Sequence, residues 1–264
     1  MATTTSYAPG TFCWFELATK DTPAAKTFYS SLFGWQADDN EYAPGMIYTT
    51  LRNNGKSVGA LYSLDASQLD QGVRPHWNLY IAVASADEST AKAKSLGGAI
   101  IKEPFDAAEH GRMSVVQDPT GAMVCLWQAK NNPGAQLVDQ VNSFCWPELY
   151  TRDPEEAKVF YMGLLGWDLG GDANYTEWKS GGRPIGGMME IKPEWGPVPP
   201  HWNLYVMVEN CDESTTKAKE LGAQVIMAPD TIPGVGRYSM LLDPQGAKIS
   251  LFQPSSQGRE AKEK

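Results

Sequence analysis

The residues of this sequence that could transfer protons occur in matched pairs. His76 and His201 are each the second residue of the hexapeptide Pro-His-Trp-Asn-Leu-Tyr, and Glu16 and Glu148 each follow the Trp of a Phe-Cys-Trp tripeptide by two positions. A partly desolvated carboxylate near an imidazole is suited to general acid–base catalysis. The alternative is structural: a glutamate that accepts from a Tyr or Trp donor, and a histidine held by its neighbours at the start of a strand. Both interpretations stay open.

The pairs arise from an internal duplication. Residues 75–97 return at 200–222 with most positions identical, and the Phe-Cys-Trp tripeptide at 12–14 returns at 144–146. The tripeptides lie 132 residues apart and the hexapeptides 125, so the second copy is seven residues shorter between Trp167 and His201. Self-similarity on this scale indicates two copies of one structural unit. We predict domains at 8–129 and 142–253, a linker at 130–141 and a disordered tail at 254–264.

Alternating side chains predict the strands that position these residues. In residues 11–18, Cys13, Phe15 and Leu17 would share one face, and Trp14 and Glu16 the other. The first set is expected to pack under helices that begin at about Asp21 and Asp87, which leaves a second face for binding. In the first copy this face would carry Trp14, Glu16, His76, Asn78, Tyr80, Cys125 and Trp127. In the second copy it would carry Trp146, Glu148, His201, Asn203, Tyr205, Ser250 and Phe252.

The remaining elements of each copy read as short strands. In the first copy we expect strands near 46–51 and 56–63, a polar connection at 64–74, and a closing hairpin at Asp118-Pro119-Thr120-Gly121. Each copy thus contains the sequence strand, helix and strands twice. Such units leave one sheet face uncovered unless the sheet curls around a cavity or packs on a partner.

Composition narrows the class of partner. The chain has 264 residues, 42% hydrophobic residues, nine Trp and a net charge of −9, which permits two cores and argues against nucleic acid. We find no apolar run long enough for a membrane span and no signal peptide, and four Cys without a dense pattern fit a reducing cytoplasm. A small-molecule ligand and a cytoplasmic monomer or homodimer are expected, with no nucleic acid and no membrane partner.

Several motifs together resemble the glyoxalase, bleomycin-resistance and extradiol-dioxygenase superfamily, known as the vicinal oxygen chelate fold. They are the first strand, the Asp21 and Asp153 caps, the Phe-Tyr pairs at 28–29 and 160–161, the Gly-Trp pairs at 34–35 and 166–167, and the two Asp-Pro-x-Gly hairpins. The sequence is most similar to two-domain glyoxalase-like proteins of actinobacteria, some of them labelled antigens or hydroxylases. The resemblance implies an α+β fold of tandem domains, each with two βαβββ units whose curved mixed sheets form a cup.

The resemblance also implies a divalent metal held by His, Gln and Glu in each cup. The corresponding positions here are Trp14 and Trp146, Asn78 and Asn203, and Cys125 and Ser250, with a fourth near 59–60 and 186–187. An indole does not bind a hard cation, and an amide with one thiol or hydroxyl is a poor donor set. We therefore predict that neither cup holds a metal or cofactor.

Three hypotheses for function follow. The first is a metal-independent small-molecule binding protein of the bleomycin-resistance kind, with an apolar or aromatic ligand. The second is an enzyme, an isomerase, lyase or hydroxylase-like protein of secondary or cofactor metabolism, in which Glu16, Glu148, His76 and His201 transfer protons. The third is a scaffold protein with occluded cups. Cys125 could be a nucleophile or packing, and Arg112 and Arg237 could bind an anionic ligand group or be solvated.

Overall fold

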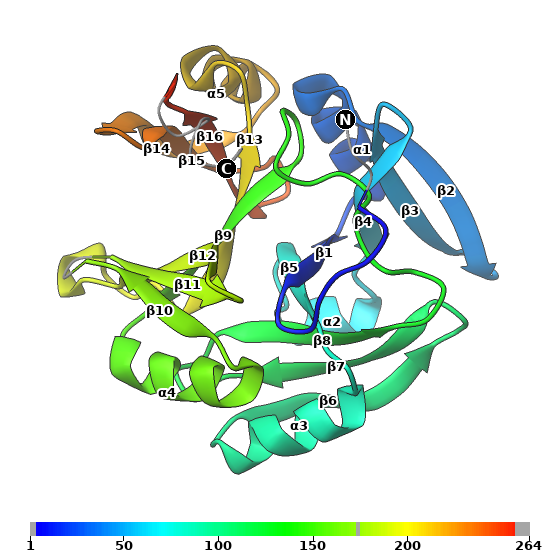
Figure 1. Cartoon of the computed structure of the whole chain (residues 1–264). Coiled ribbons are helices and arrows are strands. Elements are labelled where there is room, and N and C mark those ends of the chain that lie inside the picture. Colours follow the sequence, from blue (N-terminus) through cyan, green and yellow to red (C-terminus); the bar gives the residue numbers. More distant parts are fainter. Residues whose placement is uncertain (1–3, 173–174, 257–264) are drawn as a thin grey trace.

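Two eight-stranded sheets form the computed structural model, which describes residues 4–172 and 175–256 (Figure 1). The first half of the chain contains β1 (Phe12–Thr19), α1 (Thr22–Phe33), β2 (Gln36–Ala43), β3 (Met46–Asn53), β4 (Lys56–Ser63), α2 (Ala66–Asp70), β5 (His76–Ala82), α3 (Ala86–Ser95), β6 (Ala99–Ala107), β7 (Gly111–Gln117) and β8 (Met123–Ala129). The second half contains β9 (Phe144–Thr151), α4 (Pro154–Leu165), β10 (Asp168–Gly171), β11 (Thr176–Ser180), β12 (Arg183–Glu190), the 3₁₀ turn η1 (Pro193–Trp195), β13 (His201–Met207), α5 (Cys211–Glu220), β14 (Gln224–Ile232), β15 (Gly236–Leu242) and β16 (Lys248–Pro254).

Each half completes its own sheet. The strand orders are β2-β3-β4-β1-β5-β8-β7-β6 and β10-β11-β12-β9-β13-β16-β15-β14, so the two βαβββ units of one half pair with each other rather than with the other half. At the centre, β1 runs parallel to β4 and antiparallel to β5. This arrangement confirms the predicted α+β fold of tandem domains with curved mixed sheets.

Helix boundaries follow the predicted caps. The carboxylate of Asp21 accepts from the backbone N–H of Ala24, and Asp153 accepts from Glu156, each at 2.9 Å. Gly34 and Gly166 end α1 and α4 in the left-handed conformation, with φ of 73° and 69°.

The residue-level prediction missed β2, β10 and α2. The β2 sequence, Gln-Ala-Asp-Asp-Asn-Glu-Tyr-Ala, is mostly polar because β2 is an edge strand with little buried surface. In the stretch expected to be a polar connection, Asp65 and Gln68 form a capping box that begins α2.

A register shift in β1 corrects one face assignment. Phe12 pairs with Ile81 and Trp14 with Tyr80, which leaves Cys13 as the extra residue of a bulge. Phe12, rather than Cys13, therefore shares the helix-covered face with Phe15. The same shift occurs in β9, where Cys145 packs with Tyr205 and Met207.

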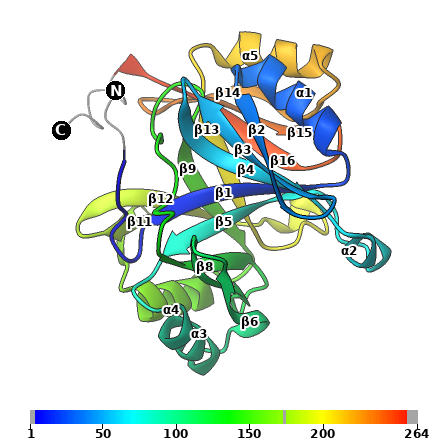
Figure 2. The same cartoon turned by 90° about the vertical axis from the view of Figure 1, so that its right-hand side faces the viewer.

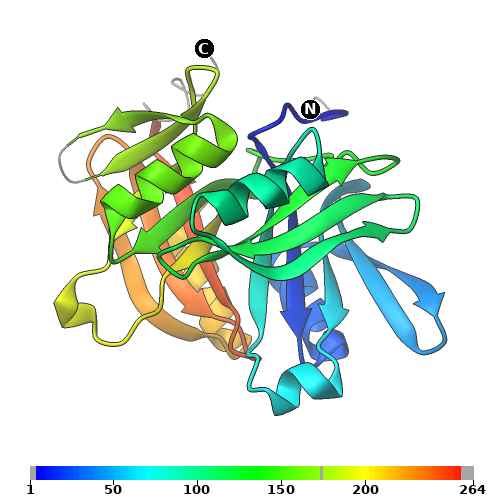
Figure 3. The same ribbon diagram turned by 90° about the horizontal axis from the view of Figure 1, so that it is seen from below.

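The helix-covered faces of the two sheets meet at an interface with approximate two-fold symmetry. Helix α1 lies beside α5, and α3 beside α4 (Figures 1, 2 and 3). The rings of Phe15 and Phe144 stack across it with their centroids 4.2 Å apart. Tyr29 donates to Asp243, and Tyr161 donates to Asp118, each at 2.9 Å. Two motifs of the family resemblance, Phe-Tyr and Asp-Pro-x-Gly, thus bind the two halves together.

The segment between the sheets packs against the first one. Ala135 and Leu137 are buried, and the backbone N–H of Ala135 donates to the carbonyl oxygen of Cys13 at 2.8 Å. The predicted tail at 254–264 falls mostly on residues 257–264, which lie outside the described residues, while β16 continues through Pro254. Among the described residues, no helix combines the length and apolar character needed to cross a membrane.

Candidate functional site

The face of each sheet opposite the helices is here called a cup: the first cup belongs to β1–β8 and the second to β9–β16. At the centre of the first cup, the Glu16 carboxylate accepts hydrogen bonds from Tyr48 at 2.6 Å and from Tyr80 at 2.5 Å. The Trp14 indole donates to the Tyr48 oxygen at 3.0 Å. Glu16 and Tyr80 are buried and Tyr48 is half-buried. The Trp14 N–H, both tyrosine hydroxyls and both carboxylate oxygens of Glu16 each have a hydrogen-bond partner within this network.

The second cup repeats the network. Glu148 accepts from Tyr175 at 2.8 Å and from Tyr205 at 2.9 Å, and Trp146 donates to the Tyr175 oxygen at 2.9 Å. Each cup therefore holds a Trp–Tyr–Glu–Tyr network around one buried carboxylate.

The two cups differ beside this network. In the first cup, Asn78 lies 3.2 Å from both the Tyr62 hydroxyl and Nε2 of His76. In the second cup, Asn203 instead bonds to Ser250 at 3.0 Å. The second cup also contains a cluster of Tyr150, His201 and Lys248. The His201 ring stacks on Tyr150 with centroids 5.2 Å apart, and Nζ of Lys248 lies 3.0 Å from Nε2 of His201.

Burial sets the protonation states in the first cup. Desolvation raises the pKa of Glu16, while the hydrogen bonds from Tyr48 and Tyr80 act in the opposite direction. Desolvation, and then the nearby Glu16 charge, raise the pKa of both tyrosines well above 10, so they remain donors. A carboxylate with a raised pKa is better matched to proton transfer near neutrality than an exposed one.

Burial also acts on the cationic groups of the second cup. It lowers the pKa of His201 to about 4, with a further lowering from the charge of Lys248. It lowers the pKa of Lys248 to about 8, against the opposing effect of Glu148. At neutral pH His201 is therefore neutral, and an appreciable fraction of Lys248 is a neutral amine.

Large aromatic rings cover one end of each cup. Trp127 is buried, and its indole donates to the carbonyl oxygen of Asn132 at 2.9 Å. Phe252 takes the same place in the second cup and is half-buried. A Cβ atom at Gly111 would lie 2.4 Å from the Trp127 ring, and one at Gly236 would lie 2.7 Å from Phe252, so glycine is required beneath both rings.

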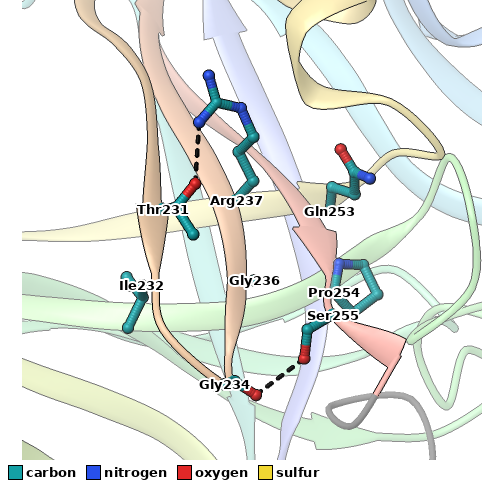
Figure 4. A pocket seen from close by; sticks show the side chains of 8 residues that line it. All are labelled: Thr231, Ile232, Gly234, Gly236, Arg237, Gln253, Pro254 and Ser255. Carbon is teal, nitrogen blue, oxygen red and sulfur yellow. Dashed lines mark hydrogen bonds between the residues drawn. The ribbon is translucent and has the colours of Figure 1, made fainter.

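Arg112 and Arg237 lie outside the cups, which corrects their placement among the ligand-binding residues. Both point to the helix-covered face, where Arg112 pairs with Asp87 and Arg237 with Asp212, each at 2.6 Å. Arg237 also lines a surface groove of about 260 Å³ formed by β14–β16 (Figure 4). A second groove, of about 250 Å³, lies between α3 and β6.

The other predicted site residues come together as expected from strand parity. Glu16 pairs with Asn78, Trp14 with Tyr80, and Tyr80 with Cys125 across neighbouring strands. Cys125 is fully buried, and burial followed by the Glu16 charge raises its thiol pKa, which favours packing over a nucleophilic role.

The residues at the family's metal positions do not fit a metal. Trp14 donates its N–H to Tyr48, and in the second cup Asn203 and Ser250 bond to each other. A Cβ atom at Gly187 would lie 1.8 Å from the Tyr175 hydroxyl, so that hydroxyl occupies the place of the fourth position. Within residues 4–172 and 175–256, no group of three His, Cys, Asp or Glu side chains is arranged to hold a metal ion.

Sequence reasoning missed five residues of the cups: Tyr48, Tyr62, Tyr150, Tyr175 and Lys248. The duplication carried a signal for two of them, because a Tyr precedes the same hairpin in both copies and each buried Glu needs donors. Tyr62, Tyr150 and Lys248 have no counterpart of the same type in the other copy, so no repeat signal marked them.

Fold and sequence comparisons agree on the class of protein. The model of the Glyoxalase/Bleomycin resistance protein/Dioxygenase superfamily matches residues 11–126 and 139–251, and the chain belongs to this family. The structure resembles the Mn(II)-bound glyoxalase from Novosphingobium aromaticivorans, with a TM-score of 0.63 at 16% identity over 93% of this chain and 82% of that one. It also resembles the 2,3-dioxygenase LapB from Pseudomonas sp. KL28, with a TM-score of 0.64 at 13% identity over 93% and 92%. At these identities the likeness concerns the fold alone.

Two relatives are similar over nearly their whole length. The chain is 40% identical over 257 residues to a protein named putative glyoxylase CFP32 of Mycobacterium tuberculosis, covering 95% of this chain and 97% of that protein. It is 34% identical over 263 residues to the anthracycline biosynthesis protein DnrV of Streptomyces peucetius, covering 94% and 95%.

Proposed function

We propose that this protein binds an apolar or aromatic small molecule in its cups without a metal, in the manner of bleomycin-resistance proteins. The observation that carries the proposal is the replacement of metal-binding side chains by aromatic rings and phenol hydroxyls in both cups. Aromatic walls with a few convergent polar groups suit a planar organic ligand. The names of two relatives, which refer to anthracycline biosynthesis, point to a polycyclic aromatic ligand.

Titration with an anthraquinone tests this proposal. Trp146, which is half-buried in the second cup, is expected to report binding by quenching of its fluorescence, and the melting temperature is expected to rise with ligand concentration. Replacing Trp146 with Phe should weaken binding, whereas Val159→Ala, at a side chain that is 68% exposed on α4, should not. Stoichiometric zinc, iron or manganese in the purified protein would contradict metal independence.

An enzymatic role is the second candidate, because Glu16 is buried with a raised pKa and lies opposite Asn78, whose side-chain oxygen is 3.2 Å from Nε2 of His76. Glu16 or Glu148 would then accept a proton from a bound substrate in an isomerase, lyase or hydroxylase-like reaction, with His76 or His201 as the partner acid or base. Replacing Glu16 and Glu148 with Gln keeps the shape and removes the base. Unchanged turnover of a substrate by the double variant would rule these carboxylates out as its bases.

A scaffold role remains the third hypothesis. It rests on the burial of the residues at the centre of both cups, among them Glu16, Tyr80, Glu148 and Tyr205. A melting temperature that no aromatic compound changes would favour it over ligand binding.

A further inference from the structure

Lys248 is the cup residue in which the two copies differ most in chemistry. Its amine lies 3.0 Å from Nε2 of His201 and 4.8 Å from the centre of the Tyr150 ring. Nδ1 of His201 lies 2.8 Å from the carbonyl oxygen of Pro199. A carbonyl oxygen only accepts, so Nδ1 carries the ring proton and Nε2 presents its lone pair to the amine.

These contacts form the arrangement of an activated nucleophile: an amine, a base within hydrogen-bond distance, and a third group that orients the base. From this geometry we infer that Lys248 forms a Schiff base with an aldehyde or ketone group of a ligand in the second cup. The inference goes beyond binding, because it assigns a covalent step to one residue and does not require that the ligand be aromatic.

The step balances with the groups present. The lone pair on Nζ of the neutral amine adds to the carbonyl carbon, and the carbonyl π electrons become a lone pair on oxygen. Nε2 of His201 then transfers the two nitrogen protons to that oxygen one after the other. The first converts the alkoxide into a hydroxyl, and the second lets this hydroxyl leave as water while the nitrogen lone pair forms the C=N bond. No oxidant or reductant is needed.

The charges around the amine favour this role. Burial lowers the pKa of Lys248 to about 8, and the ionisable groups that face it are His201 on β13 and Tyr150 and Glu148 on β9. Compared with an ordinary lysine, whose pKa is about 10.4, the neutral fraction at pH 7 rises by about 200-fold. Lower basicity reduces intrinsic nucleophilicity, so the expected gain in rate is about tenfold.

The first cup provides a natural comparison. Met123 takes the place of Lys248 and is 48% exposed, Ala18 takes the place of Tyr150, and Nε2 of His76 lies 3.2 Å from the side-chain oxygen of Asn78. The covalent step is therefore assigned to the second cup alone.

Reductive trapping tests the inference on the unmodified protein. The protein is incubated with benzaldehyde and sodium cyanoborohydride at pH 7, and peptide mass mapping gives the rate of benzylation at each lysine. Lys248 is expected to react about tenfold faster than Lys94 and Lys219, a matched pair of exposed lysines on α3 and α5. Equal or slower reaction of Lys248 in the folded protein would overturn the inference.

Two variants separate the contributions. His201→Gln should slow labelling of Lys248 at least threefold while leaving Lys94 unchanged, because glutamine does not take up the proton. Lys248→Met carries the residue of the first cup and should show no rapid labelling. Unchanged labelling of Lys248 in the His201→Gln variant would show that His201 is not the base in this step. Anthraquinone binding is measured separately, so rapid labelling without binding would contradict only the proposed function.

Discussion

Removing the hydroxyl of Tyr29 is predicted to destabilise the whole chain. This hydroxyl donates to Oδ2 of Asp243 in the other half and accepts from the Trp77 indole at 3.1 Å, and all three side chains are buried. Oδ1 of Asp243 accepts from three backbone N–H groups, whereas its Oδ2 accepts from Tyr29. Tyr29→Phe loses a bond to a charged group, worth about 1.5–3 kcal/mol, and leaves the indole N–H without its acceptor. We expect a loss of about 3 kcal/mol in the free energy of unfolding.

Urea denaturation followed by tryptophan fluorescence measures this loss. The matched control is Tyr42→Phe, at a side chain that is 67% exposed, which should change stability by less than about 0.5 kcal/mol. Tyr161→Phe should cost about as much as Tyr29→Phe, because Tyr161 makes the same contacts to Asp118 and Trp202. A cost below about 1 kcal/mol for both Tyr29→Phe and Tyr161→Phe would refute the assignment of these motifs to the interface.

Three further predictions concern the cups. The four cysteines, all buried, should resist iodoacetamide in the native protein and react on unfolding, since burial raises the thiol pKa of Cys13 above its ordinary value. Alkylation is counted by mass spectrometry. Neutral His201 contributes stability above its unfolded pKa of about 6.5, and this contribution is lost as the pH falls toward its folded pKa of about 4. Between pH 7 and 5, the His201→Gln variant should therefore lose about 1–2 kcal/mol less stability than the parent, as measured by urea titration. Gly111→Ala should cost about 2 kcal/mol in the same assay because its Cβ would overlap the Trp127 ring, whereas at Gly170 the Cβ meets chiefly the flexible end of Lys179 and the cost should be smaller.

The duplication made most of the fold predictable. Two sets of matching caps and hairpins, at Asp21 and Asp153 and at the two Asp-Pro turns, fixed the order of elements without a structure. The edge strand β2 was not predicted, because its eight residues are mostly exposed and polar. β2 is held by backbone pairing with β3 rather than by burial of an apolar face, so the hydrophobic periodicity of the sequence does not indicate it.

Strand parity predicted the residues at the centre of each cup but not the side chains that form hydrogen bonds with them. It placed Trp14 and Glu16 on one face correctly, because alternation holds wherever a strand is regular. It failed at Cys13, where a bulge interrupts alternation. The tyrosines that donate to Glu16 come from other strands, and such cross-strand contacts depend on a register that local sequence does not contain.

The two cups keep one network but place their additional polar groups differently. In the first cup, Tyr62 on β4 lies beside Ala18 on β1; in the second, Tyr150 on β9 lies beside Met189 on β12. This exchange moves a phenol ring to the strand next to β13, where it stacks on His201 and faces Lys248. A cation needs such a partner to be stable in a half-buried site, and Met123 in the first cup needs none. The exchange of one tyrosine between strands therefore accounts for an amine in only one cup, and we expect the two cups to select ligands of different polarity.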